Sequence, residues 1–167
     1  MRQRPHLQRR AIAYLAYGGG GSFTTAVAEY FQDESGAGVG PIDVTFNRPT
    51  ATMFETLSDL VLLDLSSGWV TRAGGNQSIC TGQRDRSRAW ARVIYTAYGR
   101  KGRAPQMVGL AYPSSVWGPG RCIALWETGR AAFPSRPAVT RALADPAFEP
   151  AVAKAARDLG SYVVADP

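Results

Sequence analysis

Expected strands and helices follow one another along this chain in an irregular order. Apolar runs typical of strands lie at residues 11–17, 42–46, 60–65, 107–112, 122–126 and 161–164. Helical spacing of apolar residues is found at 23–31, 84–98 and 151–159, and residues 50–57 fit neither pattern clearly. Because strands and helices do not alternate as regular βαβ units, the sequence favours an α+β fold over a doubly wound sheet. We expect a mixed sheet with helices packed on it.

The length of the chain fits one domain. It has 167 residues, of which 45% are hydrophobic, and this is enough for a compact core. With no internal repeat and no interdomain linker, we expect a single domain over residues 1–167, including an N-terminal arm at 1–10 that is either truncated or disordered. No apolar run reaches the roughly 18 residues of a membrane span, and the start lacks the apolar stretch of a secretory signal. We therefore expect a cytoplasmic protein without membrane contact.

Histidine and cysteine are scarce, which excludes several kinds of catalytic site. His6 is the single histidine, so a catalytic triad or a histidine-rich metal site would depend on this one residue. Cys80 and Cys122 lie far apart with no second pair, so neither a zinc site nor a disulfide framework is indicated. We expect no metal and no prosthetic group. The two cysteines are expected to be reduced thiols, with one bridge between them as the alternative.

Arginine dominates the positive charge of the chain. There are 19 basic and 13 acidic residues, a net charge of +6, and the only lysines are Lys101 and Lys154. The helix expected at 84–98 has an apolar stripe, formed by Trp90, Ile94, Ala97 and Tyr98. Another face of it carries a row of arginines, Arg84, Arg88 and Arg92. This arginine row favours a solvated helix face, and the alternatives are nucleic-acid binding or docking of an antitoxin or subunit.

Two polar residues lie where strands and helices often carry chemistry. Glu29 comes late in the helix at 23–31, after a strand that contains Tyr14 and Tyr17. Ser114 follows a strand and a proline, a strand-end position where functional hydroxyl groups are common. Taken alone, Glu29 has an ordinary interpretation as an exposed helix residue, and Ser114 has one as a turn-forming serine.

Taken in order, five stretches of the chain resemble the RES domain family, which is named for its Arg, Glu and Ser residues. They are AIAYLAY with TTAVAEYF, LVLLDLSSGWVTRAG, RSRAWARVIY, GLAYPSS and CIALWE. The resemblance covers nearly the whole chain. It aligns Glu29 with the glutamate of the family and Ser114 with its serine.

This resemblance implies a fold like that of the ADP-ribosyltransferases and a toxin of a type II toxin–antitoxin pair. Such toxins consume NAD+ by hydrolysis or phosphorolysis of its nicotinamide–ribose bond, as an NAD+ glycohydrolase or an NAD+ phosphorylase. NAD+ is then a substrate, and inorganic phosphate is the second substrate in phosphorolysis. The implied partner is an antitoxin with an Xre-like DNA-binding region that blocks the active-site cleft. Contact with nucleic acid is expected only through that antitoxin.

The resemblance also implies roles for individual residues. Glu29 and Ser114 are the expected catalytic residues: the carboxylate stabilises positive charge that develops on the ribose, and the hydroxyl group binds the substrate by a hydrogen bond. Tyr14 is expected to contact the nicotinamide. Tyr17 is the substitute for it, because the four glycines at 18–21 lengthen the path to Glu29.

The arginine of the family normally lies in a Gly-Arg-aromatic pattern before the tyrosine strand, and that pattern is absent from this chain. Arg4 matches it best by spacing, with Arg9 and Arg10 as substitutes, and is expected to bind the pyrophosphate. Two alternatives stay open for the function. One is transfer of ADP-ribose from NAD+ to a protein, and the other is a non-catalytic basic module that binds nucleic acid or a partner.

Overall fold

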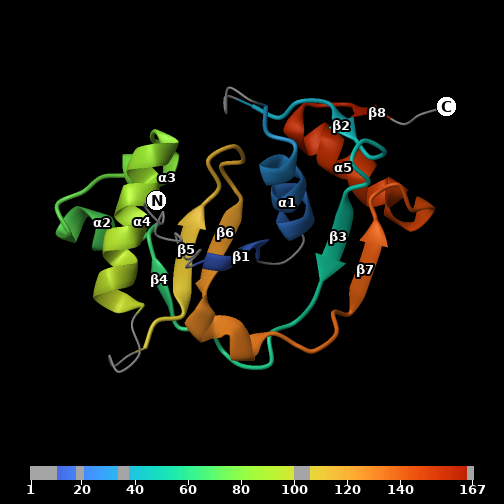
Figure 1. Cartoon of the computed structure of the whole chain (residues 1–167). Coiled ribbons are helices and arrows are strands. Elements are labelled where there is room, and N and C mark those ends of the chain that lie inside the picture. The colour runs from blue at the N-terminus through green and yellow to red at the C-terminus, as the bar shows by residue number, and fades with distance from the viewer. Residues whose placement is uncertain (1–10, 18–20, 34–37, 100–105, 165–167) are drawn as a thin grey trace, which may run out of the picture.

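A mixed four-stranded sheet forms the centre of the fold (Figure 1). The structure is a computed structural model and describes residues 11–17, 21–33, 38–99 and 106–164. The strand order is β1-β6-β5-β4. These strands are β1 (Ala11–Ala16), β4 (Leu62–Asp64), β5 (Gly109–Pro113) and β6 (Arg121–Trp126). β6 runs antiparallel to both β1 and β5, whereas β4 runs parallel to β5, so the predicted mixed sheet and α+β class are confirmed.

Helices lie at both ends of this strand order (Figure 1). They are α1 (Ser22–Tyr30), α2 (Trp69–Arg72), α3 (Ser78–Thr81), α4 (Arg84–Tyr98) and α5 (Glu149–Leu159). Helix α4, with α2 and α3, lies by β4 and β5, and α1 lies by β1 and β6. Two 3-10 helices are η2 (Glu127–Ala132) and η3 (Pro146–Phe148). Among the described residues, no helix is both long and apolar enough to cross a membrane.

Two short sheets complete the side of the molecule that holds α1 and α5. β2 (Ile42–Asp43) pairs in parallel with β8 (Val163–Val164). β3 (Thr50–Met53) pairs antiparallel with β7 (Val139–Ala142). The sequence interpretation left residues 50–57 undecided and had no strand at 139–142. Both segments are mostly exposed, so neither has the apolar run that marks a buried strand.

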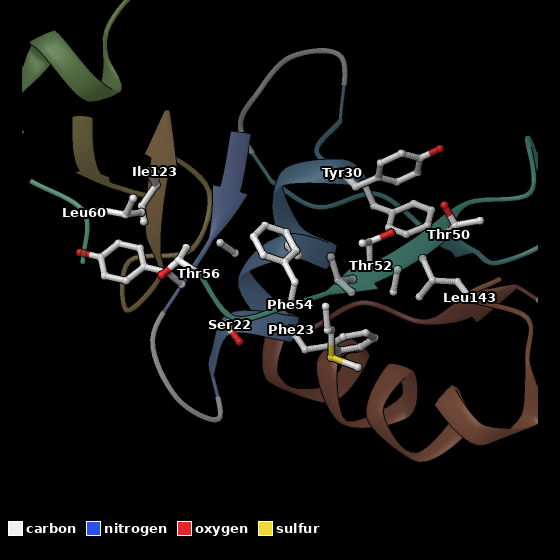
Figure 2. Close-up of a pocket in the computed structure, with 17 residues that line it drawn as sticks. Ser22, Phe23, Tyr30, Thr50, Thr52, Phe54, Thr56, Leu60, Ile123 and Leu143 are labelled. Atoms are coloured by element: carbon white, nitrogen blue, oxygen red, sulfur yellow. The ribbon is translucent and has the colours of Figure 1, made fainter. Parts of the chain in front are cut away.

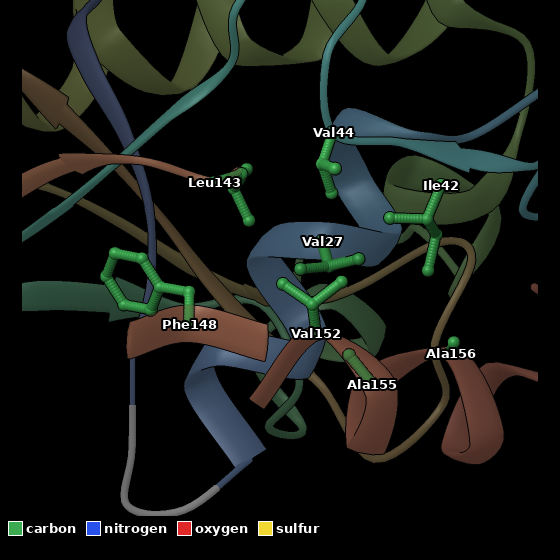
Figure 3. Close-up of a cluster of buried hydrophobic side chains, with 8 residues drawn as sticks. All are labelled: Val27, Ile42, Val44, Leu143, Phe148, Val152, Ala155 and Ala156. Carbon is green, nitrogen blue, oxygen red and sulfur yellow. The ribbon is translucent and has the colours of Figure 1, made fainter. Parts of the chain in front are cut away.

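Helices α1 and α5 pack against each other in one of two hydrophobic cores. Its buried members are Val27, Ile42, Val44, Leu143, Phe148, Val152, Ala155 and Ala156 (Figure 3). Ala155 is fully buried, and its small side chain allows the two helix backbones to come close. One hydrogen bond also crosses this interface: the Thr24 hydroxyl group donates to the Asp158 carboxylate at 3.4 Å. Lys154 also pairs with Asp158 and is the main cause of the lowered pKa of that carboxyl group.

The second core lies between α4 and the sheet. Its buried members are Leu63, Leu65, Val70, Ile79, Ile94, Leu110 and Trp126. Val70 and Ile79 come from α2 and α3, in the segment 66–82, where the sequence predicted neither a helix nor a strand. Each of these short helices buries one side chain while the polar residues around it stay exposed.

Two other local predictions need correction. The strand expected at 42–46 stops at Asp43, because the Asp43 carboxylate accepts hydrogen bonds from the backbone amides of Thr45 and Phe46 and turns the chain. Trp90 was expected in the apolar stripe that faces the core, but 38% of it is exposed. The rest of the prediction is supported, because Ile94 of the same stripe is 2% exposed.

Gly109 occupies a position in β5 with no room for a side chain. A Cβ atom there would lie 2.4 Å from the carbonyl oxygen of Ala124 on the neighbouring strand. We expect Gly109→Ala to lower the free energy of unfolding by about 1–3 kcal/mol, because backbone atoms must move to relieve the contact. Urea unfolding measures the change. Gly118→Ala is the matched control, since nothing lies within 4 Å of its added Cβ atom, and equal midpoints for the two variants would contradict this packing.

Candidate active site

The carboxylate of Glu29 and the hydroxyl group of Ser114 form a short hydrogen bond. Ser114 Oγ donates to Glu29 Oε1 at 2.6 Å, although the residues are 85 positions apart in the sequence. Glu29 comes from the last turn of α1, and Ser114 directly follows β5. Ser114 is only 5% exposed and Glu29 is half-buried. A charge-assisted bond of this kind is stronger than a bond between neutral groups, and it fixes the position of the carboxylate.

The hairpin between β5 and β6 holds Ser114 in place. Its hydroxyl oxygen accepts hydrogen bonds from the backbone amides of Val116 at 3.2 Å and Trp117 at 3.0 Å. Its own amide donates to the Gly120 carbonyl oxygen at 2.9 Å. The single proton of the hydroxyl group is in the bond to Glu29, so in this arrangement Ser114 has no proton left for another molecule. In this arrangement Ser114 holds the Glu29 carboxylate in place. The substrate contact expected of Ser114 stays a prediction.

A close approach of backbone to side chain brings this hairpin against α1. A Cβ atom on Gly120 would lie 2.7 Å from Thr25 Cγ2 and 2.9 Å from the Trp117 carbonyl oxygen. Thr25 is 1% exposed, and its hydroxyl group donates to the Gly21 carbonyl oxygen at 2.8 Å. Thr25 and Glu29 are four residues apart and share one side of α1. Glycine at 120 thus allows the contact that aligns Ser114 with Glu29.

Cys122 is a third polar group near Glu29. It lies in β6, in register with Ala16 of β1 and Tyr112 of β5, and is 4% exposed. Burial raises the pKa of the Cys122 thiol to about 12, and the negative charge of Glu29 and a hydrogen bond to it add to the shift. Burial also raises the pKa of Cys80, with a further contribution from Asp64. Both cysteines are free, as predicted, and the alternative of a bridge is wrong.

A cavity of about 520 Å³ lies between α1 and β3 (Figure 2). Aromatic residues in its lining are Tyr17, Phe23, Tyr30, Phe31 and Phe54, and hydroxyl-bearing residues include Ser22, Thr50, Thr52 and Thr56. Thr50 and Thr52 lie on one side of the space, and Leu60 and Ile123 on the other. None of the lining residues, all of which belong to the described part of the chain, carries a charge.

Glu29 lies outside the lining of this cavity, as does Ser114. Ser22 and Ala26 do line it, and they precede Glu29 on α1 by seven and three residues, so they neighbour Glu29 along the helix. By its helix position, the carboxylate is therefore beside the wall of the cavity rather than in it.

The structure brings together three of the five residues expected at the site. Glu29 and Ser114 are bonded, and Tyr17, which is 39% exposed, lines the adjacent cavity. Tyr14 lies in β1, but its side chain is not described. Arg4 lies outside the described residues, as do its substitutes Arg9 and Arg10.

The sequence interpretation missed Cys122 and the threonines of the cavity. The pattern CIALW indicated a strand, but the register that sets Cys122 near Glu29 is not visible in the sequence. Thr50, Thr52 and Thr56 lie in the segment with no clear pattern. Their alternate spacing was the one available signal for a strand that turns hydroxyl groups to one face.

Comparisons with known proteins identify one family. The sequence model of the RES domain matches residues 11–153. Comparison with curated proteins gave no match, and comparison with solved structures gave none either. The implied likeness to the ADP-ribosyltransferase fold therefore stays a prediction.

The raised pKa of Cys122 predicts a loss of stability at alkaline pH. The unfolded thiol loses its proton near its ordinary value of 9.0, whereas the folded thiol keeps it up to about 12. Between these values the unfolded state binds fewer protons, so Cys122 should lower the free energy of unfolding by up to about 1.4 kcal/mol per pH unit. Denaturant unfolding from pH 8 to 11, compared between wild type and Cys122→Ala, measures this. The prediction is wrong if the difference between the two proteins does not change with pH.

Proposed function

Because the chain belongs to the RES domain family, we propose that it is a toxin enzyme that breaks the nicotinamide–ribose bond of NAD+. Membership supports a toxin-like module of the RES type in general. The observation that carries the finer proposal is the Glu29 carboxylate, held by Ser114 beside the wall of an aromatic cavity without charged lining. A fixed carboxylate beside a site for a flat ring suits cleavage of a bond between a ring nitrogen and a sugar carbon.

The chemistry requires stabilisation of positive charge. When the bond between the nicotinamide nitrogen and ribose C1′ breaks, the electron pair leaves with the nitrogen and the ribose becomes oxocarbenium-like. The Glu29 carboxylate stabilises this charge and orients the attacking group. An oxygen of water or inorganic phosphate then bonds to C1′, and a proton of the attacking group is released. The products are nicotinamide and either ADP-ribose or ADP-ribose with phosphate on C1′.

The cavity suits the nicotinamide end of the substrate better than its pyrophosphate. Aromatic faces such as Tyr17 and Phe23 attract a cationic or polarised ring, and the threonine hydroxyl groups can bind an amide. Two negative phosphates need cationic partners, and the cavity lining has none. The pyrophosphate therefore lies outside the cavity, where Arg4, or Arg9 or Arg10 in its place, would bind it.

Members of this family generally pair with antitoxins. For this chain we propose an Xre-like antitoxin that covers the Glu29 site and blocks entry of NAD+. In such a pair the antitoxin would bind the DNA, and this chain would make no contact with nucleic acid.

NAD+ carrying a label on its ADP-ribose part separates cleavage from the alternative of ADP-ribose transfer, because transfer leaves the label on a protein.

The expected effect of Glu29→Gln is a fall in kcat of about 100-fold or more, because the neutral amide cannot stabilise the oxocarbenium-like state. Nicotinamide release from NAD+ is measured with and without phosphate. The matched control is Glu149→Gln, which changes an exposed carboxylate at the start of α5 and should leave the rate unchanged. A folded wild-type protein that releases no nicotinamide, or equal rates for Glu29→Gln and wild type, would overturn the proposal.

Ser114→Ala tests the positioning role separately. The variant frees the carboxylate to move and leaves the amides of Val116 and Trp117 without their acceptor. We expect a fall in kcat of about tenfold or more with KM little changed, because Ser114 acts through Glu29 rather than on the substrate. An increase in KM with kcat unchanged would instead support a direct bond between Ser114 and NAD+.

A further inference from the structure

The outer side of α4 carries exposed apolar residues in a regular row. Val93 is 60% exposed and Trp90 is 38% exposed, and Ala89 beside them is also exposed. Arg86, Trp90 and Val93 recur at four- and three-residue intervals, so they share one side of the helix. Ile94, one turn after Trp90 and next to the edge of this row, is buried against the sheet. We call Ala89, Trp90 and Val93 the α4 seam.

Arginines lie within the α4 seam and along one side of it. Arg86 lies between Trp90 and Val93 on the helix surface, and Arg92 and Arg88 lie further around the helix, on the side away from Ile94; all three arginines are exposed. The single acidic residue of α4 is Asp85, which pairs with Arg88 at 4.0 Å. A binding partner therefore meets apolar side chains with one guanidinium group among them and two more along one side.

This surface is separate from the proposed active site. Helix α4 packs on β4 and β5, at one end of the strand order, whereas Glu29 lies on α1 beside β1 and β6 (Figure 1). The α4 seam also shares no residue with the cavity beside Glu29. A molecule bound to the seam would leave the cavity open.

We propose that the α4 seam is a docking surface for an acidic amphipathic helix of a protein partner. The apolar row at intervals of three and four residues matches the side of a second helix laid along α4. Glutamate or aspartate residues that flank the apolar side of that helix would pair with Arg86 and Arg92. Tryptophan and arginine are the residue types that contribute most to such interfaces when truncated.

The exposed apolar residues favour a protein over a nucleic acid. Phosphate contacts are made by cations and hydrogen-bond donors, and they gain nothing from the exposed side chains of Val93 and Ala89. Asp85 would also repel a phosphate backbone. The inference goes beyond NAD+ cleavage, because it concerns another face of the chain and does not need the reaction to occur.

Two synthetic helical peptides test the docking surface. Both carry leucines at the same positions along one side, and the remaining positions are glutamate in one peptide and lysine in the other. Fluorescence anisotropy with the full chain should show saturable binding of the glutamate peptide and none of the lysine peptide. We expect Trp90→Ala to weaken binding by about tenfold or more, and the double variant Arg86→Glu with Arg92→Glu to weaken it at least as much.

The control is Tyr162→Ala, which removes an aromatic ring of 63% exposure far from the seam in the sequence and should leave binding unchanged. Circular dichroism shows whether each variant is folded. The inference is overturned if the glutamate peptide does not bind or binds all variants alike. It is also overturned if duplex DNA binds to the chain, loses affinity in the Arg86→Glu and Arg92→Glu double variant and keeps it in Trp90→Ala. Dissociation of a dimer of the chain itself by Trp90→Ala would overturn it as well. Nicotinamide release, measured on the same samples, reports on the proposed reaction separately.

Discussion

Helix α1 is fixed by contacts on two sides, and these contacts determine where the site can form. On one side Val27 packs on the small residues of α5, and Thr24 binds Asp158. On another side the hairpin after β5 comes close enough for Gly120 to touch Thr25. With the helix held in this way, the carboxylate of Glu29 has few positions open to it. The bond to Ser114 then selects one of them, beside the wall of the cavity.

Much of the fold follows from apolar patterns, and the rest depends on contacts between distant segments. The patterns at 11–17, 84–98 and 122–126 became β1, α4 and β6 with small changes at their ends. Periodicity on α4 identified the buried side, because Ile94 belongs to the predicted stripe, but it did not show that Trp90 at the edge of that stripe stays partly exposed. The exposed pair β3 and β7 has no apolar run at all, so its pairing could not be predicted.

The same limit applies to the site. The resemblance singled out Glu29 and Ser114, and the structure places the two in direct contact. The state of the Ser114 hydroxyl group could not be predicted, because its proton is committed by a geometry that includes two amides of the hairpin. Cys122 lies near Glu29 through strand register, which a single sequence does not encode. The cavity depends on β3, the strand with the weakest pattern.

The separation between Glu29 and Ser114 has a consequence for synthesis of the chain. During translation α1 emerges long before the hairpin that carries Ser114, and its packing partner α5 emerges later still. Contacts between such distant segments form slowly, because loop closure costs conformational entropy before the contacts compensate for it. Early in synthesis the chain therefore has the Glu29 carboxylate but not the group that positions it. The contact between the two can form only after the hairpin has been made and has folded against α1.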